Sequence, residues 1–390
     1  MKWEKVRLGD ICDIRDGTHD SPKYVKEGYP LITSKNIIDK SLNFNDVNLI
    51  SKEDYESINR RSYVDDGDIL MPMIGTIGNP VIVKKERDFA IKNVALFKFN
   101  SNSKCLNKFI YYILESDYFD KMKSLLNRGG TQKFISLSDI RDLKIPLPPL
   151  HIQEKIAATL DKASSIIDKR KKQIQELNEL SQSIFIKMFG DPVKNPMGWD
   201  TKELCKITKI ETGSTPNRKE KDYYTNGNIP WIKTGEINDS NITNAEENIT
   251  KLALKNSNCK IFPINTILIA MYGQGKTRGK CGILKIAATT NQACAAILPN
   301  DNYSTQYLFS LLKLSYLNLR KLSRGGNQPN LNLDIIKNYL VPAPQLHFQQ
   351  KFASISENIE KYKSYLTSSL IELEENYKLL MQKGFNGDIE

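Results

Sequence analysis

The feature that most constrains this chain is an internal duplication with a period of 196 residues. Identical residues recur at this spacing from Trp3 to Phe189. Short solenoid repeats have periods of roughly 20 to 50 residues, so a spacing kept over this length indicates that a whole folding unit was copied. The recurring residues are Trp3, Gly17, Arg128, Gly129, Gly130, Pro146, Pro148, His151, Gln153, Lys155, Lys187 and Phe189, and their second copies are Trp199, Gly213, Arg324, Gly325, Gly326, Pro342, Pro344, His347, Gln349, Lys351, Lys383 and Phe385.

The alignment of the two copies drifts in the middle of the unit. Pro30 aligns with Pro230 at an offset of 200, and Ile69 aligns with Ile267 at 198. Small insertions that later cancel are typical of loops, where binding chemistry varies on a fixed scaffold. Two copies of equal overall length whose loops differ in length predict two binding domains with different targets.

Composition limits the class of protein. A chain of 390 residues with 40% apolar side chains predicts two or three globular domains. No apolar run approaches the length of about 20 residues that spans a bilayer, and the first residues lack the apolar core of a secretion signal, so we expect a cytoplasmic protein. The six cysteines contain no C-x-x-C pair and indicate neither a zinc site nor a disulfide framework.

The net charge is +11, and +8 of it lies in residues 191–345. Lysine and arginine that neutralise phosphates release counterions, so a basic excess in the globular parts favours a polyanionic partner. Charge alone is weak evidence, because many proteins are mildly basic.

Two long helices are the clearest elements. Each begins after a proline-rich stop, at 146–149 or 342–344, and each ends near a glycine, Gly190 or Gly384. At 1.5 Å per residue, helices of about 35 to 40 residues are roughly 50 to 60 Å long. The first helix carries apolar or small residues in a 4,3 rhythm, and so does the second: Leu160, Ala163, Ile167, Ile174, Leu177, Ile184 and Met188, and then Phe348, Phe352, Ile355, Ile359, Leu366, Leu370, Leu373, Tyr377 and Leu380.

The two apolar stripes are complementary. Arg170 and Ser181 interrupt the first, whereas the equivalent positions of the second are Leu366 and Tyr377. We therefore expect an antiparallel coiled coil related by a pseudo-twofold axis; the alternative is that each helix covers only its own domain. Short β-rich runs such as 69–71, 80–83, 94–97, 267–269 and 295–298, and helical spacing over 106–126 and 304–323, complete a mixed α/β (α+β) fold. The predicted domains are 1–149 and 191–345, with helices in 150–190 and 346–390.

Catalytic motifs are missing. The chain has no Asn/Asp-Pro-Pro-aromatic motif of amino-methyltransferases, no dinucleotide fingerprint and no G-x-S-x-G elbow. The segment from Gly273 to Thr277 resembles the end of a phosphate-binding loop, but Ala270 stands where the first glycine is required. His151 and His347 lie beside the helix starts, where capping or packing is expected, and His19 has no counterpart.

Glycine-rich turns carry the best candidates for binding. The turn at 272–280 and its counterpart at 73–78, and the two Arg-Gly-Gly turns at 128–133 and 324–328, combine cations with amide side chains. Arginine can bind guanine bidentately, and glutamine or asparagine can bind adenine in the same way. Ordinary turn chemistry remains an alternative for each.

Several segments together resemble a known family. Gly17 to Tyr24, followed by Gly28 to Ile37, is similar to the target recognition domains of Type I restriction-modification DNA specificity subunits. The second copy carries another version of these motifs, and 146–156 and 342–352 resemble the family's helix starts. Gly235-Glu236 departs from it, since an aspartate usually follows the Pro-Trp segment. The second-copy segments are Thr212 to Pro216, Ile229 to Ile232 and Thr290 to Ala293.

The resemblance implies a non-catalytic subunit without a cofactor or metal of its own. It would recognise a bipartite, asymmetric site in double-stranded DNA, one half-site per domain, with the paired helices setting the spacer. It would dock two methyltransferase subunits and the motor-nuclease restriction subunits, which bring S-adenosylmethionine, ATP and magnesium. A rigid spacer predicts half-site centres about one helical turn apart, roughly 34 Å.

A solvated surface role is the alternative for each candidate DNA contact. A stand-alone nuclease or methylase and a protein-only coiled-coil scaffold remain as other functions. The predicted DNA-binding residues are Lys23, Lys35, Arg128, Gln132, Lys133, Arg218, Lys233, Gln274, Lys276, Arg278, Arg324 and Gln328.

Overall fold

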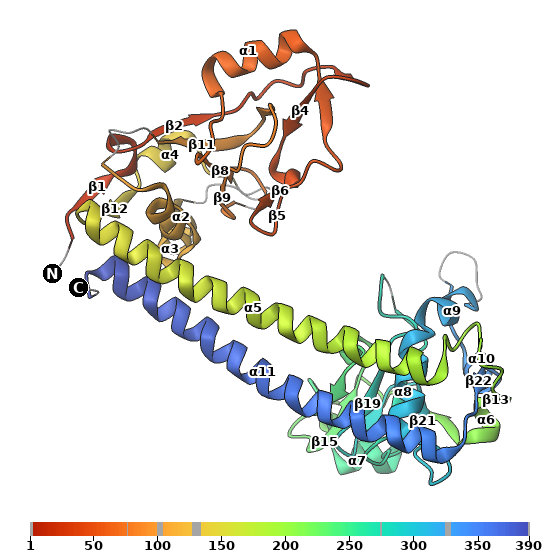
Figure 1. Ribbon diagram of the computed structural model, residues 1–390. Coiled ribbons are helices and arrows are strands. Elements are labelled where there is room, and N and C mark those ends of the chain that lie inside the picture. Colours follow the sequence, from red (N-terminus) through yellow and green to blue (C-terminus); the bar gives the residue numbers. More distant parts are fainter. Residues whose placement is uncertain are drawn as a thin grey trace. The chain divides into compact units, whose positions relative to one another are not determined.

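The computed structural model describes residues 3–75, 77–99, 104–126, 134–273, 275–323 and 329–388. The chain divides into two compact units, each with sheets, short helices and parts of the two long helices α5 and α11 (Figure 1). The first unit comprises Met1–Lys171 and Ser368–Glu390, and the second comprises Lys172–Thr367. Each unit therefore combines one end of α5 (Leu150–Phe189) with the opposite end of α11 (Leu346–Asn386).

The first unit contains two four-stranded sheets. One has the order β2-β11-β8-β9 and is antiparallel throughout, and the other has the order β10-β4-β7-β3. The pairs β1-β12 and β5-β6 complete it. The strands are β1 (Lys5–Arg7), β2 (Asp13–Asp16), β3 (Tyr24–Val25), β4 (Tyr29–Ile32), β5 (Ile37–Ile38), β6 (Ser41–Leu42), β7 (Asn48–Ile50), β8 (Ile69–Pro72), β9 (Val81–Ile82), β10 (Ala90–Ile91), β11 (Val94–Lys98) and β12 (Lys144–Pro146), and the short helices are α1 (Lys52–Ser62), α2 (Asn107–Glu115), α3 (Asp117–Leu126) and α4 (Leu137–Arg141).

The second unit repeats this plan with different strand numbers. Its main sheet has the order β14-β21-β18-β19-β16, its smaller sheet the order β17-β15-β20, and β13 pairs with β22. The strands are β13 (Thr201–Glu203), β14 (Ile210–Thr212), β15 (Ile229–Ile232), β16 (Asn241–Ile242), β17 (Asn248–Ile249), β18 (Ile267–Ala270), β19 (Cys281–Leu284), β20 (Thr289–Thr290), β21 (Cys294–Ile297) and β22 (Leu340–Pro342), and the short helices are α6 (Leu204–Ile207), α7 (Lys251–Asn256), α8 (Thr305–Leu314), α9 (Tyr316–Lys321) and α10 (Leu333–Lys337).

The predicted strands are confirmed as β8, β9, β11, β18 and β21, but each predicted medium-length helix is two helices. The chain breaks between α2 and α3 at Ser116 and between α8 and α9 at Ser315. The Ser116 hydroxyl donates to the Ile113 carbonyl at 2.6 Å. A serine that bonds its own turn competes with the helical ladder, and apolar periodicity does not reveal this.

Both long helices begin where the sequence predicts, and α5 also ends there. The predicted end of α11 at Gly384 is wrong, because α11 continues through Gly384 to Asn386 and the left-handed glycine that follows it is Gly387, with φ +87°. Pro149 and Gln345 precede residues 150 and 346, and Gly190 follows Phe189 with φ +79°. The Gly190 amide donates to the Ile186 carbonyl at 2.8 Å, so this left-handed glycine terminates α5.

The two long helices pack side by side and antiparallel. In the first unit Lys171 Nζ lies 2.8 Å from Glu374 Oε1, and in the second unit Lys363 Nζ donates to Asn178 Oδ1 at 3.1 Å. Residue numbers rise along α5 as those of the contacted residues fall along α11, which requires opposite directions (Figure 1). Leu366, at the position complementary to Arg170, is buried.

A buried glutamine anchors the first turn of each long helix. Gln153 accepts from the Leu106 amide at 2.8 Å and donates to the Pro148 carbonyl at 2.8 Å. Its equivalent Gln349 accepts from the Ser304 amide at 3.0 Å and donates to the Pro344 carbonyl at 2.7 Å. Both side chains are fully buried, so their amide groups satisfy backbone groups that water does not reach.

We expect Gln349→Leu to lower the free energy of unfolding by about 1 to 3 kcal/mol, because the Ser304 amide and the Pro344 carbonyl would lose their partner in a buried place. The measurement is the urea midpoint of the purified protein. The neighbouring exposed residue provides the control Gln350→Leu, which should stay within about 0.5 kcal/mol of wild type. Equal midpoints for the two variants would show that the buried amide contributes nothing.

Candidate nucleic-acid interface

In each unit a glycine segment crosses from the main sheet to the smaller sheet. Gly17 donates its amide to the Val94 carbonyl at 3.1 Å, and Thr18 donates to the Ile91 carbonyl at 3.0 Å. Ser214, which follows Gly213, donates to the Thr290 carbonyl at 2.9 Å. A Cβ on Gly17 would lie 2.2 Å from the Ile91 oxygen, and one on Gly213 would lie 1.8 Å from the Thr290 oxygen. The glycine is required because two backbones touch here.

In the first unit, this segment leads into a polar cluster around Asp16. The buried Asp16 carboxylate accepts from Arg61 and, at 2.9 Å, from His19 Nε2, whose other ring nitrogen lies 2.8 Å from Asn93 Oδ1. A histidine ring that is protonated on both nitrogens can donate to both of these oxygens. The hydrogen bond to Asp16, together with that to Asn93, raises the pKa of His19 above its ordinary value. These contacts favour the charged form of His19, a residue to which the sequence assigned no role, beside the crossing.

The two described first-unit candidates are exposed. Lys23 precedes β3, and Lys35 lies in the short turn Ser34–Asn36. In that turn the Asn36 side chain accepts from the Thr33 amide at 3.0 Å. The turn thus has a fixed shape from which the Lys35 ammonium group extends into solvent.

Glu247 brings two second-unit candidates together. Arg218 forms a bidentate pair with this carboxylate, and Lys233 Nζ lies 3.7 Å from it. The guanidinium also lies 4.4 Å from the Tyr224 ring centre and 4.5 Å from that of Trp231. Hydrogen bonding to Glu247 raises the pKa of Arg218, and the same bond lowers the pKa of Glu247. Half of the Arg218 side chain remains exposed, so the planar group is stacked and oriented but still accessible.

The two glycine-rich loops each lie against the residues that follow an Arg-Gly-Gly sequence. The Ile135 amide donates to the Met73 carbonyl at 3.0 Å, and the Leu331 amide donates to the Met271 carbonyl at 3.0 Å. Arg278 donates to the Pro329 carbonyl, whereas Lys276 is exposed. The predicted contacts Arg128, Gln132, Lys133, Gln274, Arg324 and Gln328 lie outside the described residues.

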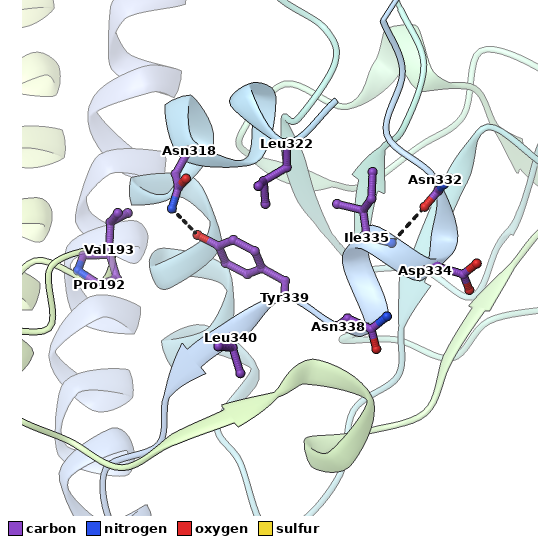
Figure 2. A pocket seen from close by; sticks show the side chains of 10 residues that line it. All are labelled: Pro192, Val193, Asn318, Leu322, Asn332, Asp334, Ile335, Asn338, Tyr339 and Leu340. Atoms are coloured by element: carbon purple, nitrogen blue, oxygen red, sulfur yellow. Dashed lines mark hydrogen bonds between the residues drawn. The ribbon is translucent and has the colours of Figure 1, made fainter. Parts of the chain in front are cut away.

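The second unit also has a hollow of about 530 Å³ between α9, α10 and the segment after α5 (Figure 2). Asn318 Nδ2 donates to the Tyr339 hydroxyl at 3.4 Å, and Asn332 accepts from the Ile335 amide at 2.8 Å. Among the described residues that line it, Asp334 is the one charged residue. A single carboxylate beside amides and apolar groups does not make an acid–base pair.

Other reactive groups are few. All six cysteines are free thiols, and five of them are buried. Within the described ranges, no three His, Cys, Asp or Glu side chains gather closely enough to hold a metal ion. None of the helices in the same ranges combines the length and apolarity that a membrane crossing requires.

Sequence reasoning missed the cations on α3 and α9 that contact the glycine-rich loops. Lys123 donates to the Ile77 carbonyl at 3.3 Å, and Arg320 donates to the Gly275 carbonyl at 2.9 Å. Neither belongs to a pair with the offset of 196. The sequence signal for these two cations is weaker than a repeat at 196 residues. Lys123 follows Phe119 by four positions, and Arg320 follows Tyr316 by four positions.

Comparison with known proteins agrees with the duplicated plan. The family model described as Type I restriction modification DNA specificity domain matches residues 1–179 and again residues 196–375. The MjaIX specificity subunit of Methanocaldococcus jannaschii is 33% identical over 199 residues, which cover 47% of this chain and 44% of that protein. The match therefore spans less than half of that relative. The EcoR124I/EcoR124II specificity subunit of Escherichia coli is 25% identical and is matched over 73% of this chain and 71% of its own length.

Two solved structures share the fold. The S subunit of a Type-I restriction-modification system from M. genitalium has a TM-score of 0.59 at 17% identity, covering 99% of this chain and 96% of that one. A chain solved in work on complex assembly and conformational transition of the type I R-M system has a TM-score of 0.61 at 18% identity, covering 100% and 98%. Since the family model matches both copies over nearly the whole length, the chain belongs to the family of Type I restriction-modification DNA specificity subunits.

Proposed function

We propose that this protein is the non-catalytic subunit that gives a Type I restriction-modification complex its DNA sequence specificity. It recognises a bipartite, asymmetric site, with one half-site for each target recognition domain. The observation that carries the proposal is the duplication itself: two units with one plan, each with its own glycine crossing and loops of different composition. Two copies with different loops suit an asymmetric target, because each half-site is read by separate side chains.

The domain limits follow from this proposal. Residues 1–149 and 191–345 are the two target recognition domains, and 150–190 and 346–390 are the spacer helices between them. The basic excess of residues 191–345 supports contact with phosphates. Lys23, Lys35 and Lys276 are exposed, and Arg218 and Lys233 converge on one carboxylate. These residues and the seven remaining candidates stay proposed DNA contacts.

The proposed partners are two methyltransferase subunits and the restriction subunits, which supply S-adenosylmethionine, ATP and magnesium in the cytoplasm, where the DNA lies. A duplicated chain presents two equivalent sets of surface residues, which suits two identical partners. Ile166 on α5 and its repeat equivalent Tyr362 on α11 are 48% and 53% exposed. Large apolar side chains left exposed at equivalent positions suit partner contacts.

Mapping of methylated positions in the host genome tests the function. We expect deletion of this gene to abolish methylation at one split, gapped motif, because the methyltransferase subunits lose their DNA target recognition. Return of the intact gene should restore the same motif. Unchanged methylation in the deletion strain, or loss of methylation at an ungapped motif, would contradict the proposal.

A further inference from the structure

Helix α9 holds the glycine-rich loop of the second unit by its backbone. Arg320 donates from Nη1 to the Arg278 carbonyl at 2.9 Å and from Nη2 to the Gly275 carbonyl at 2.9 Å. The Tyr316 hydroxyl donates to the Lys276 carbonyl at 2.8 Å and accepts from Arg320 Nη1 at 3.1 Å. Three carbonyl groups within four residues of the loop are thus bound by one aromatic–cation pair.

The loop has a shape that depends on this contact. Gly273, Gly275 and Gly279 have φ values of +141°, +60° and +88°. A Cβ on Gly279 would lie 3.2 Å from Arg320 Cγ and 3.5 Å from Tyr316 Cδ2, so the helix pair rests directly on this glycine. With its carbonyl groups bound, the loop leaves the Lys276 side chain exposed.

The first unit contains a simpler form of the same device. Lys123 donates to the Ile77 carbonyl at 3.3 Å and lies 5.9 Å from the ring centre of Phe119, four residues earlier on α3. Gly78 has φ +101°, and a Cβ there would lie 3.7 Å from Lys123 Nζ. Phe119 has no hydroxyl group, and Lys123 binds one loop carbonyl where the second-unit pair binds three. The duplication therefore kept the arrangement while its chemistry changed.

We propose that the Tyr316–Arg320 pair and the Phe119–Lys123 pair are positioning devices, each of which fixes one DNA-reading loop before DNA arrives. This inference rests on the proposed function. A loop that becomes ordered only on binding loses conformational entropy at that step, and this loss weakens the affinity for DNA. A loop that is already ordered in the free protein therefore binds more tightly. Arg320 itself makes no DNA contact in this scheme, because both terminal guanidinium nitrogens already donate to the protein. The second unit, with more bonds, should depend on its pair more strongly.

The test uses the complex assembled with its methyltransferase subunits and DNA carrying the mapped site. Arg320→Ala should weaken binding about 10- to 100-fold, since the loop must then be ordered on binding. The matched control is Lys321→Ala, which removes the same charge from the exposed neighbouring position and should change affinity less than about twofold. Tyr316→Phe removes one hydrogen bond while keeping the ring, and should give a smaller loss in the same direction.

Salt dependence separates positioning from phosphate contact. A lysine or arginine that binds a phosphate changes the slope of log affinity against log salt by about 0.9 when it is removed. We expect Arg320→Ala to leave the wild-type slope unchanged and to speed amide hydrogen exchange in residues 275–279 of the free protein. A reduced slope with unchanged exchange would overturn the inference and make Arg320 a direct contact.

The half-sites provide the last readout. When one half-site of the DNA is scrambled, the Arg320→Ala complex should lose less affinity than the wild-type complex. When the other half-site is scrambled, the Lys123→Ala complex should lose less affinity than the wild-type complex. Equal affinity of Arg320→Ala and wild type, or effects on the same half-site for both variants, would refute the positioning role. If the Arg320→Ala complex does not assemble, the Tyr316→Phe complex is tested in its place, by the same measurements of affinity, salt slope, amide exchange and half-site preference. Failure of the wild-type complex to prefer the split site would instead refute the proposed function.

Discussion

Gly213→Ala is expected to lower the free energy of unfolding by about 3 kcal/mol or more, because an added Cβ would overlap a backbone oxygen. The Cβ would lie 1.8 Å from the Thr290 oxygen and 2.5 Å from its carbonyl carbon. The clash cannot be relieved by turning a side chain, since both atoms belong to the backbone that carries the Ser214 to Thr290 hydrogen bond. The measurement is chemical denaturation followed by circular dichroism.

Gly235 gives the matched control, since it lies in the short turn Thr234–Glu236 and a Cβ there would meet nothing within 4 Å. Gly235→Ala should change stability by no more than about 0.5 kcal/mol. The equivalent change Gly17→Ala should destabilise the first unit for the same reason, with a contact of 2.2 Å to the Ile91 oxygen. A Gly213→Ala protein as stable as Gly235→Ala would mean that the two sheets do not approach each other this closely.

The duplication and the long helices could be predicted from the sequence because their signals are local or periodic. Prolines before 150 and 346, and a glycine after Phe189, mark boundaries that depend on a few adjacent residues. The sheet order could not be predicted, since strands β2 and β11 are far apart in the chain and each has only four or five residues. Short apolar runs carry no information about their neighbours in a sheet.

The candidate site was predictable as a set of loops but not as a set of contacts. The sequence gives no sign that Glu247, 29 residues after Arg218, engages its guanidinium group. It also gave Gln153 and Gln349 as a recurring pair without indicating that each is buried and binds backbone groups. The offset of 196 identifies residues that stabilise the fold common to both copies. Residues that bind the variable loops need not recur at this offset.

Phe189→Ala is expected to lower the free energy of unfolding by about 3 to 5 kcal/mol, the cost of deleting a fully buried aromatic ring. Phe189 is 1% exposed, and its ring centre lies 4.8 Å from that of Tyr307 and 5.7 Å from that of Phe352. These neighbours come from α8 and α11, so one ring joins the end of α5 to the core of the second unit and to the other long helix. The surrounding rings are also packed on Phe185, which limits their collapse into the space left behind.

Ile186→Ala on the same helix is the control. It separates the effect of losing a buried contact from the effect of alanine on helix propensity. Ile186 is 40% exposed, so its truncation removes little buried surface and should cost less than about 1 kcal/mol. Phe189→Leu should recover part of the loss seen in Phe189→Ala, because leucine refills most of the volume without the aromatic contacts. The comparison is made by urea midpoints at fixed protein concentration. If Phe189→Ala and Ile186→Ala had the same midpoint, the end of α5 would not be held by the aromatic cluster, and the attachment of the spacer helix to the second unit would have to come from its polar contacts.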